Sequence, residues 1–273
     1  YDVFINLCEG YLEWEVPSID VIHSFEALNL PHTGPSSKLY DPTKELMKYV
    51  AYCEGVPTPQ FVLIESIEDA ELACKHLSFP LFVKPAKAGD SLGVDEHSLV
   101  TNKEELLTKI EEILEEYGPL LVEEYIAGRE FTVLVAANAA PEKTCTVFKP
   151  VEYIFPEGRE FKTYALKTSE LHPDCNHPCK DKRIEKQLRR ASERIFRGFG
   201  GVGYARLDFR VNDKGKIFFL EINFTCSVFY KDGYEGSADF VLKYDEIGQA
   251  GFLHHIIAEG IARHQRKQKK FTV

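Results

Sequence analysis

The segment 203–223, GYARLDFRVNDKGKIFFLEIN, predicts a β-hairpin that carries ionisable side chains on one face. Arg206 and Asp208 lie two residues apart in the first strand, so their side chains share a face of the sheet. The same spacing relates Glu221 and Asn223 in the second strand. Carboxylate and amide oxygens suit a hard cation such as Mg²⁺. The hairpin therefore indicates a magnesium site beside an arginine, and the alternative is an ordinary amphipathic hairpin whose polar face is solvated.

The turn of this hairpin decides whether the two pairs meet. A two-residue loop at 214–215 would place Asp208 directly opposite Glu221. A four-residue loop at 212–215 would make them diagonal neighbours, which could still share a cation. A three-residue loop with a glycine bulge would shift the register by one and send Glu221 to the opposite face. The magnesium prediction therefore favours the first two turns and disfavours the bulged one.

Length and charge restrict the class of protein. The chain has 273 residues, enough for a large core divided into two or three lobes around one cleft. Its net charge of -10 argues against nucleic acid as a partner, because phosphate backbones demand an excess of Lys and Arg. No apolar run reaches membrane-spanning length, so we expect no membrane partner. The chain opens on Tyr1 and its one methionine is Met47, which leads us to expect that the natural start is missing.

The seven cysteines are an odd number and are scattered along the chain, which favours a reducing, cytoplasmic setting over a disulfide framework. The tightest cluster, HPDCNHPCKD, holds Cys175 and Cys179 together with His172 and His177. The two cysteines are flanked by prolines and lack a second, distant ligand pair. We therefore expect a plain loop here rather than a zinc site.

Strand and helix patterns are intermixed along the chain, which predicts an α+β fold built from small lobes. Asp41 and Pro42 are typical of a helix start, with an acidic N-cap and proline in the first turn. We expect one strand over 144–155 and a long, polar, irregular loop over 157–181. Long loops in a compact domain are usually functional or disordered.

Two further segments suggest phosphate and nucleotide binding. FVKPAKAGDSLGV places Lys84 at the end of an apolar strand, before a loop whose amides and hydroxyl could cradle phosphate oxygens. A strand-turn with a solvated lysine is an equal alternative. LVEEYIAGREF places Glu123 and Glu130 on either side of a hinge, where the backbone of 124–126 could meet an adenine edge and a carboxylate could take ribose hydroxyls. The alternative there is a simple hairpin.

Taken in order, these features resemble the ATP-grasp superfamily, and within it the D-alanine:D-alanine ligases. The stretches that carry the resemblance are NLPHTG, LFVKPAKAGDSLGV, VEEYIAGREFTV, FKTYALK, GYARLDFR and LEIN. The resemblance runs from about Val3 to the last helix and lacks only the family's first strand and helix. It implies a nucleotide cleft between two α+β lobes, beside an α/β N-terminal lobe. The implied division is 1–40 for that partial lobe, 41–126 for a central subdomain and 127–273 for a C-terminal subdomain with the metal site.

The resemblance also implies ATP and Mg²⁺, with Mn²⁺ as an alternative, and a ligase that joins two amino acids. ATP would phosphorylate the carboxylate of one amino acid, and the amine of the second would attack the acylphosphate. A closing lid would exclude water that otherwise hydrolyses this intermediate. The partners implied are small amino-acid, carboxylate or amine substrates, and a homodimer is allowed.

The family's site residues carry over to matching positions. The catalytic group is Arg206 for the tetrahedral oxyanion, Lys167 in the lid, Ser91 in the phosphate loop and Glu13 near the first substrate. The nucleotide group is Lys44, Lys84, Gly89, Glu123, Glu124, Tyr125, Ile126, Glu130 and again Lys167. The metal ligands are Asp208, Glu221 and Asn223.

The match fails where the second substrate should bind. After the metal-binding asparagine the family has Pro-Gly and then a serine, whereas Cys226 and Ser227 stand here and Ser237 is the only later serine candidate. Cys8 replaces a family histidine, and Glu124 replaces a lysine. Ser227 and Ser237 therefore stay open as substrate-binding residues. We expect a ligase that joins other amino acids or a non-standard carboxylate and amine.

Two other functions compete with this ligase. The first is a nucleotide-binding ATP-grasp module without turnover, for which the altered segment after the hairpin is the best argument. The second is an ATP-grasp ligase with non-amino-acid substrates, such as a carboxylase or a succinyl-CoA synthetase-like enzyme. Retention of Arg206 with the metal ligands favours catalysis, since nucleotide binding alone needs no arginine on the oxyanion side.

Overall fold

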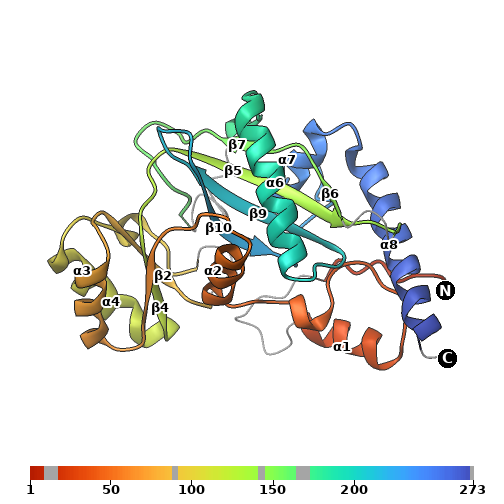
Figure 1. Cartoon of the computed structure of the whole chain (residues 1–273), viewed down its shortest axis with the longest axis horizontal. Coiled ribbons are helices and arrows are strands. Elements are labelled where there is room, and N and C mark those ends of the chain that lie inside the picture. Colours follow the sequence, from red (N-terminus) through yellow and green to blue (C-terminus); the bar gives the residue numbers. More distant parts are fainter. Residues whose placement is uncertain (9–17, 88–91, 141–144, 164–172, 271–273) are drawn as a thin grey trace.

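The structure is a computed structural model that describes residues 1–8, 18–87, 92–140, 145–163 and 173–270. It contains two antiparallel sheets, each covered by helices, which lie side by side in Figure 1. The predicted mixture of helices and strands in small lobes is therefore confirmed. None of the helices in these ranges is long and apolar enough to cross a membrane.

The smaller sheet has the strand order β1-β4-β2-β3. Its strands are β1 (Phe61–Ile64), β4 (Leu120–Glu124), β2 (Leu81–Pro85) and β3 (Leu99–Val100). Helices α3 (Ala70–His76) and α4 (Lys103–Tyr117) pack on it. In α4 the buried residues Leu106, Ile110 and Ile113 recur at helical spacing, so one face of the helix enters the core. Glu123, on β4, and Lys84, on β2, are thereby held on a rigid scaffold.

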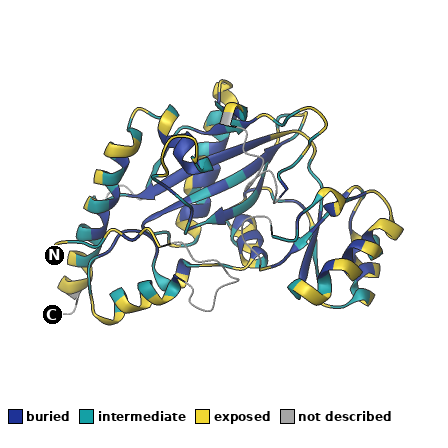
Figure 2. Cartoon of the chain, turned by 180° about the vertical axis from the view of Figure 1, so that it is seen from behind, coloured by how far each residue is buried: buried dark blue, intermediate teal, exposed yellow. Residues whose placement is uncertain are grey.

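The larger sheet has the order β10-β9-β5-β7-β8, with β6 also pairing with β5. Its strands are β5 (Arg129–Ala137), β6 (Cys145–Val147), β7 (Val151–Tyr153), β8 (Asn176–Pro178), β9 (Tyr204–Val211) and β10 (Ile217–Asn223). Helices α2 (Lys44–Cys53) and α6 (Lys182–Gly198) share one core with this sheet. Helices α7 (Ser237–Tyr244) and α8 (Gly248–Lys270) cover the other face. Figure 2 shows its strands as mostly buried.

Alternation along β9 separates the core from the polar side of the sheet. Leu207 and Phe209 are fully buried in the core beneath α6. Arg206, Asp208 and Arg210 point to the opposite face, as the period of two requires. That face is covered by α7 and α8 at one end and continues into a cleft at the other.

The predicted hairpin forms, but its turn is the one that we disfavoured. Asn212 N donates to Lys216 O (3.1 Å), and Gly215 N donates to Asn212 O (2.9 Å), so the loop has three residues, 213–215. Gly215 has φ +72°, which favours glycine. The Asn212 side chain stabilises this turn, because its Oδ1 accepts from Lys216 N (2.9 Å). Alone, this turn would send Glu221 to the wrong face.

A second bulge restores the register. Phe219 pairs with Phe209, but Glu221 pairs with Asp208, so Leu220 is the extra residue between them. Two one-residue shifts therefore compensate each other. The facing carboxylates that we predicted from a two-residue turn are present, and the reason given for them was wrong.

Other expectations also need correction. The helix predicted to start at Asp41 and Pro42 is capped by Thr43, whose Oγ1 accepts from Leu46 N (3.2 Å). The strand predicted over 144–155 is interrupted between β6 and β7, where Pro150 has no N–H group to donate to a ladder.

The loop predicted over 157–181 is in part strand β8, which pairs with β7. His177 therefore lies in a sheet, opposite Glu152. No group of three or more His, Cys, Asp or Glu that could hold a metal is found in the described part of the chain. His172 lies outside that part.

The N-terminal segment docks on the last helix. Phe4 forms a parallel bridge with His32 beside α1 (Ile19–Ala27), and Arg263 of α8 donates to His32 O (2.6 Å) and Gly34 O (2.9 Å). Figure 1 accordingly shows the N-terminus next to α8.

Candidate functional site

A cleft of about 920 Å³, open to solvent in part, lies between the two sheets. Its walls come from β2, β4 and the hinge on one side, and from β5, β9 and β10 on the other. Many of the predicted site residues line it: Lys44, Lys84, Glu123, Glu124, Tyr125, Ile126, Glu130, Arg206, Asp208, Glu221 and Ser237. Residues from Lys44 to Ser237 in the sequence are thus brought to one place. Glu13, Gly89, Ser91 and Lys167 lie outside the described residues.

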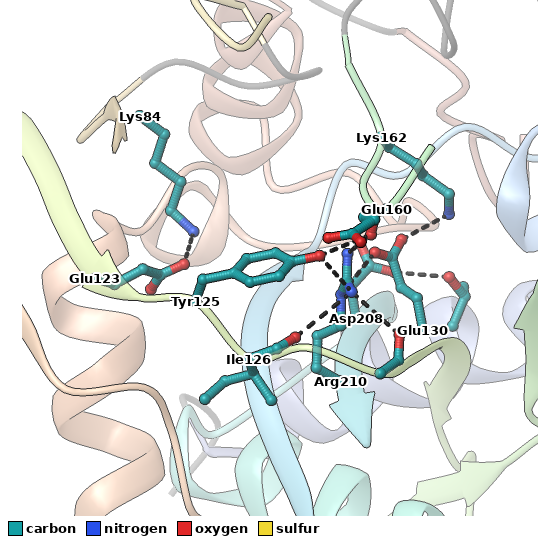
Figure 3. Close-up of polar contacts among 11 residues, drawn as sticks. Lys84, Glu123, Tyr125, Ile126, Glu130, Glu160, Lys162, Asp208 and Arg210 are labelled. Carbon is teal, nitrogen blue, oxygen red and sulfur yellow. Dashed lines mark hydrogen bonds and ion pairs between the residues drawn. The ribbon is translucent and has the colours of Figure 1, made fainter. Parts of the chain in front are cut away.

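A buried ion-pair triad connects the two sides of the cleft. Glu123 Oε1 lies 2.5 Å from Lys84 Nζ, and Glu123 Oε2 lies 2.7 Å from Lys48 Nζ (Figure 3 shows the Lys84 contact). Burial alone would raise the pKa of Glu123, but the two lysines outweigh it and hold that pKa at about 2. Burial lowers the pKa of Lys48 to about 8 although Glu123 opposes this. The carboxylate is therefore ionised at neutral pH and fixed in place.

Sequence reasoning missed Lys48. It lies one helical turn after Lys44 in α2, and this i,i+4 spacing was the available signal. Its Nζ also donates to Leu220 O (3.1 Å), at the bulge of β10. The triad therefore joins α2, β10 and β4 around the cleft. It could serve only to stabilise the fold.

In the hinge after β4, some backbone N–H groups already donate hydrogen bonds within the protein. Glu124 N donates to Gln60 O (3.0 Å) and Tyr125 N to Pro80 O (2.9 Å). The backbone of 124–126 was predicted to meet an adenine edge, and these two bonds leave Ile126 N as the backbone donor of that segment for this role. Gly128 closes the hinge with φ +130°, and a Cβ atom there would lie 2.3 Å from Val211 O. Only glycine lets the chain pass so close to β9.

An apolar slot adjoins the hinge. The rings of Phe82 and Phe161 meet edge to face at 5.0 Å, and Tyr125 lies 6.2 Å from Phe82 and 6.4 Å from Phe161. Leu220 lines the same cleft. Flat apolar walls beside a few polar groups are typical of sites for planar ligands.

Glu130 is held by two cations. Its Oε2 lies 3.2 Å from Arg210 Nε, and its Oε1 lies 3.0 Å from Lys162 Nζ (Figure 3). All three groups line the cleft. Sequence reasoning identified Glu130 but neither cation. Arg210 could have been found from its place two residues after Asp208 on the same face of β9.

The hairpin presents its polar face to the cleft. Asp208 faces Glu221 across the strands, and Asp208 Oδ2 lies 3.2 Å from Arg206 Nη2. Thr132 Oγ1, on β5, donates to Asp208 Oδ1 (2.8 Å). Two carboxylates and an arginine are thus placed side by side, with oxygen atoms of the kind that Mg²⁺ prefers.

Two further groups modify this picture. Asn223 pairs with Arg206 across the strands, but its Oδ1 accepts from Thr225 N (2.8 Å), so its predicted role as a metal ligand stays a prediction. Sequence reasoning treated Asp41 as a helix cap and missed that it lies near the predicted metal site. Burial raises the pKa of Asp41 against the effect of Lys44, and the Glu221 carboxylate raises it further. Asp41 therefore lies in the field of the predicted metal site.

The loop after the hairpin, 224–236, is organised by a buried carboxylate. Asp239 Oδ1 accepts from Phe229 N (2.7 Å), and its Oδ2 accepts from Gly236 N (3.1 Å) and Tyr230 N (3.4 Å). Phe229 has φ +68°, a left-handed conformation that is costly for a bulky residue. Asp239 therefore holds this loop in a shape that its own residues do not favour.

The substrate-binding candidates occupy different positions around this loop. Ser237 lines the main cleft at the start of α7, whereas Ser227 is partly buried in the loop. Cys226 is buried, and burial raises the pKa of its thiol to about 12, so it is neutral. Cys226 and Cys8 line one smaller pocket of about 340 Å³. Two of the departures noted in the sequence thus meet at the same place.

Comparison with known proteins identifies the family. Residues 51–228, more than half of the chain, match the family model described as the D-ala D-ala ligase C-terminus. The chain belongs to this family. The resemblance stated from the motif order is confirmed.

Individual members of the D-ala D-ala ligase family are also similar to this chain. The chain is 30% identical over 200 residues to a D-alanine--D-alanine ligase of Aquifex aeolicus, a match that covers 72% of this chain and 64% of that protein. Its structure is similar to that of the VanG D-Ala:D-Ser ligase of Enterococcus faecalis, with a TM-score of 0.72, 22% identity and coverage of 95% and 73%. A D-alanine--D-alanine ligase of Bacillus anthracis complexed with ATP has a TM-score of 0.65 at 21% identity, with coverage of 90% and 76%.

The structural likenesses confirm the predicted ATP-grasp fold. The region matched to the Aquifex relative is less than two thirds of that protein's length. The D-ala D-ala ligase family is therefore established for this chain, and its own reaction is treated below as a proposal.

Proposed function

We propose that the protein is an ATP-dependent ligase that joins two amino acids through an acylphosphate. The observation that carries this is the meeting of Arg206, Asp208 and Glu221 with Lys44 and Lys84 in one cleft. Phosphoryl transfer needs positioned cations, whereas the attack of an amine on an acylphosphate needs a donor for the developing oxyanion. A module that only bound nucleotide would need the first set and not Arg206.

The residues present fit ATP and a divalent cation. The slot of Phe82, Tyr125 and Phe161 suits a purine, and Glu130 could accept from ribose hydroxyls. Lys44 and Lys84 would hold phosphates. The Bacillus anthracis neighbour is named as a complex with ATP, which supports this nucleotide.

Asp208 and Glu221, with Asn223, would hold Mg²⁺, or Mn²⁺ as an alternative. Oxygen donors of this kind favour hard cations, and a bound divalent ion would neutralise phosphate charge. Thr132 and Arg206 orient Asp208 through its two oxygens. Arg206 is then placed to donate to an oxyanion beside the metal.

We propose that the amino acids joined are not two D-alanines. The relative and neighbours above are named for D-Ala:D-Ala and D-Ala:D-Ser ligation. This chain differs where the family resemblance places both amino acids, at Cys8 and at Cys226-Ser227, and Cys8 and Cys226 line one pocket. Ser237, which lines the main cleft, is the candidate for the second carboxylate, with Ser227 as the alternative.

Related assignments belong to the same proposal. Seven free cysteines support a reducing, cytoplasmic setting. The lobe limits 1–40, 41–126 and 127–273 and a homodimer follow from the family resemblance. They are offered with the ligase function and depend on it.

The test is release of phosphate from ATP and Mg²⁺ in the presence of pooled amino acids. The ligase proposal expects release that depends on the amino acids, and deconvolution of the pool then identifies the pair. No release with any amino acid or small carboxylate, in a protein that binds ATP, would contradict it. That result would support a nucleotide-binding module, the function favoured by Cys226-Ser227 in place of Pro-Gly.

A further inference from the structure

The Arg210 side chain contacts several parts of the cleft. Its Nη2 donates to Glu160 O (2.6 Å), and its Nη1 donates to Gly128 O (3.2 Å). The same Nη1 lies 3.3 Å from Tyr125 Oη and 3.5 Å from Ile126 O. One guanidinium therefore contacts both the hinge and the segment 155–163, which lies across it.

The surroundings of Arg210 keep it in one orientation. The residue is only 4% exposed, and its guanidinium carbon lies 5.3 Å from the Tyr125 ring and 5.2 Å from the Phe155 ring. A planar guanidinium that contacts two rings and donates to several acceptors has little rotational freedom left. Figure 3 shows its contacts converging from the hinge and from Glu160.

Glu130 is in direct contact with this arginine. Glu130 and Arg210 are direct partners in the β5–β9 ladder, so their side chains share a face. Arg210 Nε takes one carboxylate oxygen (3.2 Å) and Lys162 Nζ takes the other (3.0 Å). Lys162 lies in the same segment, 155–163. We call Glu130, Lys162 and Arg210 the Glu130 cluster.

We propose that Arg210 and Lys162 are positioning residues that aim the Glu130 carboxylate at the ribose hydroxyls of a bound nucleotide and make ribose recognition depend on the segment 155–163. This deepens the proposed function and rests on its nucleotide site. A merely structural cluster would support the sheet without affecting which sugar is bound. The two roles differ in one measurable quantity, the preference for ATP over 2′-deoxy-ATP.

The experiment measures the dissociation constants of ATP and 2′-deoxy-ATP with Mg²⁺ by calorimetry. The wild-type protein should prefer ATP by about tenfold, because a charged acceptor aimed at a hydroxyl loses that hydrogen bond in the deoxy ligand. Arg210→Met should bring the ratio of the two dissociation constants close to one, mainly by weakening the binding of ATP. Arg210→Lys should not restore it, because lysine keeps the charge but not the fork of donors.

A double-mutant cycle tests whether Arg210 acts through Glu130. Glu130→Gln should also remove the preference, and Arg210→Met combined with Glu130→Gln should lower it no further. The control is Arg129→Met, at the residue next to Glu130, which breaks an arginine ion pair with Glu152 (2.6 Å) that lies outside the cleft. That variant should keep the wild-type preference.

The outcomes separate the possible failures. An unchanged preference in Arg210→Met, or a wild-type protein without preference, would overturn this inference even if amino-acid-dependent phosphate release is observed. If Arg210→Met does not fold, Lys162→Met tests the same cluster, because Lys162 contacts the other carboxylate oxygen of Glu130. An unchanged preference in that variant would overturn the inference. A wild-type protein that binds no ATP would overturn both this inference and the proposed function.

Discussion

The hinge side of the cleft and the 224–236 loop orient their charged groups in different ways. At the hinge, Glu123 and Glu130 each contact two cations that come from other elements. Beside the loop, Asp239 of α7 contacts mainly backbone N–H groups of the loop. The ion pairs of Glu123 and Glu130 join different elements, and the Lys48–Glu123 pair connects the two sides of the cleft, whereas the bonds of Asp239 set only the shape of one loop. The difference suggests that the nucleotide side tolerates little change and that the loop is where relatives of this chain can vary.

The largest effect is expected from the metal-binding carboxylates. Glu221→Gln or Asp208→Asn should lower the turnover of ATP by about a thousandfold or more, because phosphoryl transfer loses its charge neutralisation. Phosphate release measures this, with circular dichroism to show an intact fold. Asp213→Asn, in the exposed turn of the same hairpin, is the matched control and should be neutral. Retained activity in the first two variants would refute the proposed metal site.

The next effect concerns the triad that joins the two sides. Glu123→Gln leaves Lys48 and Lys84 without their carboxylate in a buried setting and should lower the free energy of unfolding by about 3–5 kcal/mol. Urea unfolding measures it. Lys103→Met, which removes an exposed ion pair with Glu71, should leave the urea midpoint unchanged. Equal effects in both variants would mean that the triad is no more important than a surface pair.

The same carboxylate predicts a pH dependence. The folded-state pKa of Glu123, about 2, lies below its ordinary value of 4.5, so its contribution to stability is complete above pH 4.5. That contribution should be lost as the pH falls from about 4.5 to 2, by about 3 kcal/mol at most. Glu123→Gln should flatten this part of the stability curve. An identical acid limb in the variant and the wild type would show that other carboxylates control it.

The smallest effect is expected in the 224–236 loop. Asp239→Asn should raise the KM for the second amino acid by about tenfold with little change in the KM for ATP, since it loosens only this loop. Steady-state kinetics with each substrate varied in turn measures the split. Asp245→Asn is the matched control, because that carboxylate accepts two backbone N–H bonds at the other end of α7. A rise in the KM for ATP instead would erase the contrast between the two regions.

Sequence reasoning succeeded where a local pattern determines the structure. The alternation in β9 placed Arg206 and Asp208 on one face, and the order of motifs identified the fold. It failed at positions determined by distant partners. Lys48 and Arg210 look like ordinary charges in a helix and a strand, and their importance arises because other elements bring Glu123 and Glu130 to them.

The hairpin of 203–223 shows where the division lies. The sequence by itself determined that its strands alternate, that Asn212 and Gly215 form a turn, and that two carboxylates lie on polar faces. Only the tertiary structure decided that these carboxylates meet, because the turn alone gives the wrong register and the bulge at Leu220 corrects it. At that bulge, Leu220 O accepts from Lys48 and Phe219 O accepts from Thr58, both of which lie far away in the sequence. Local hydrogen bonds choose a turn, but the final register is chosen by whichever arrangement buries the core and satisfies the groups packed against the strand.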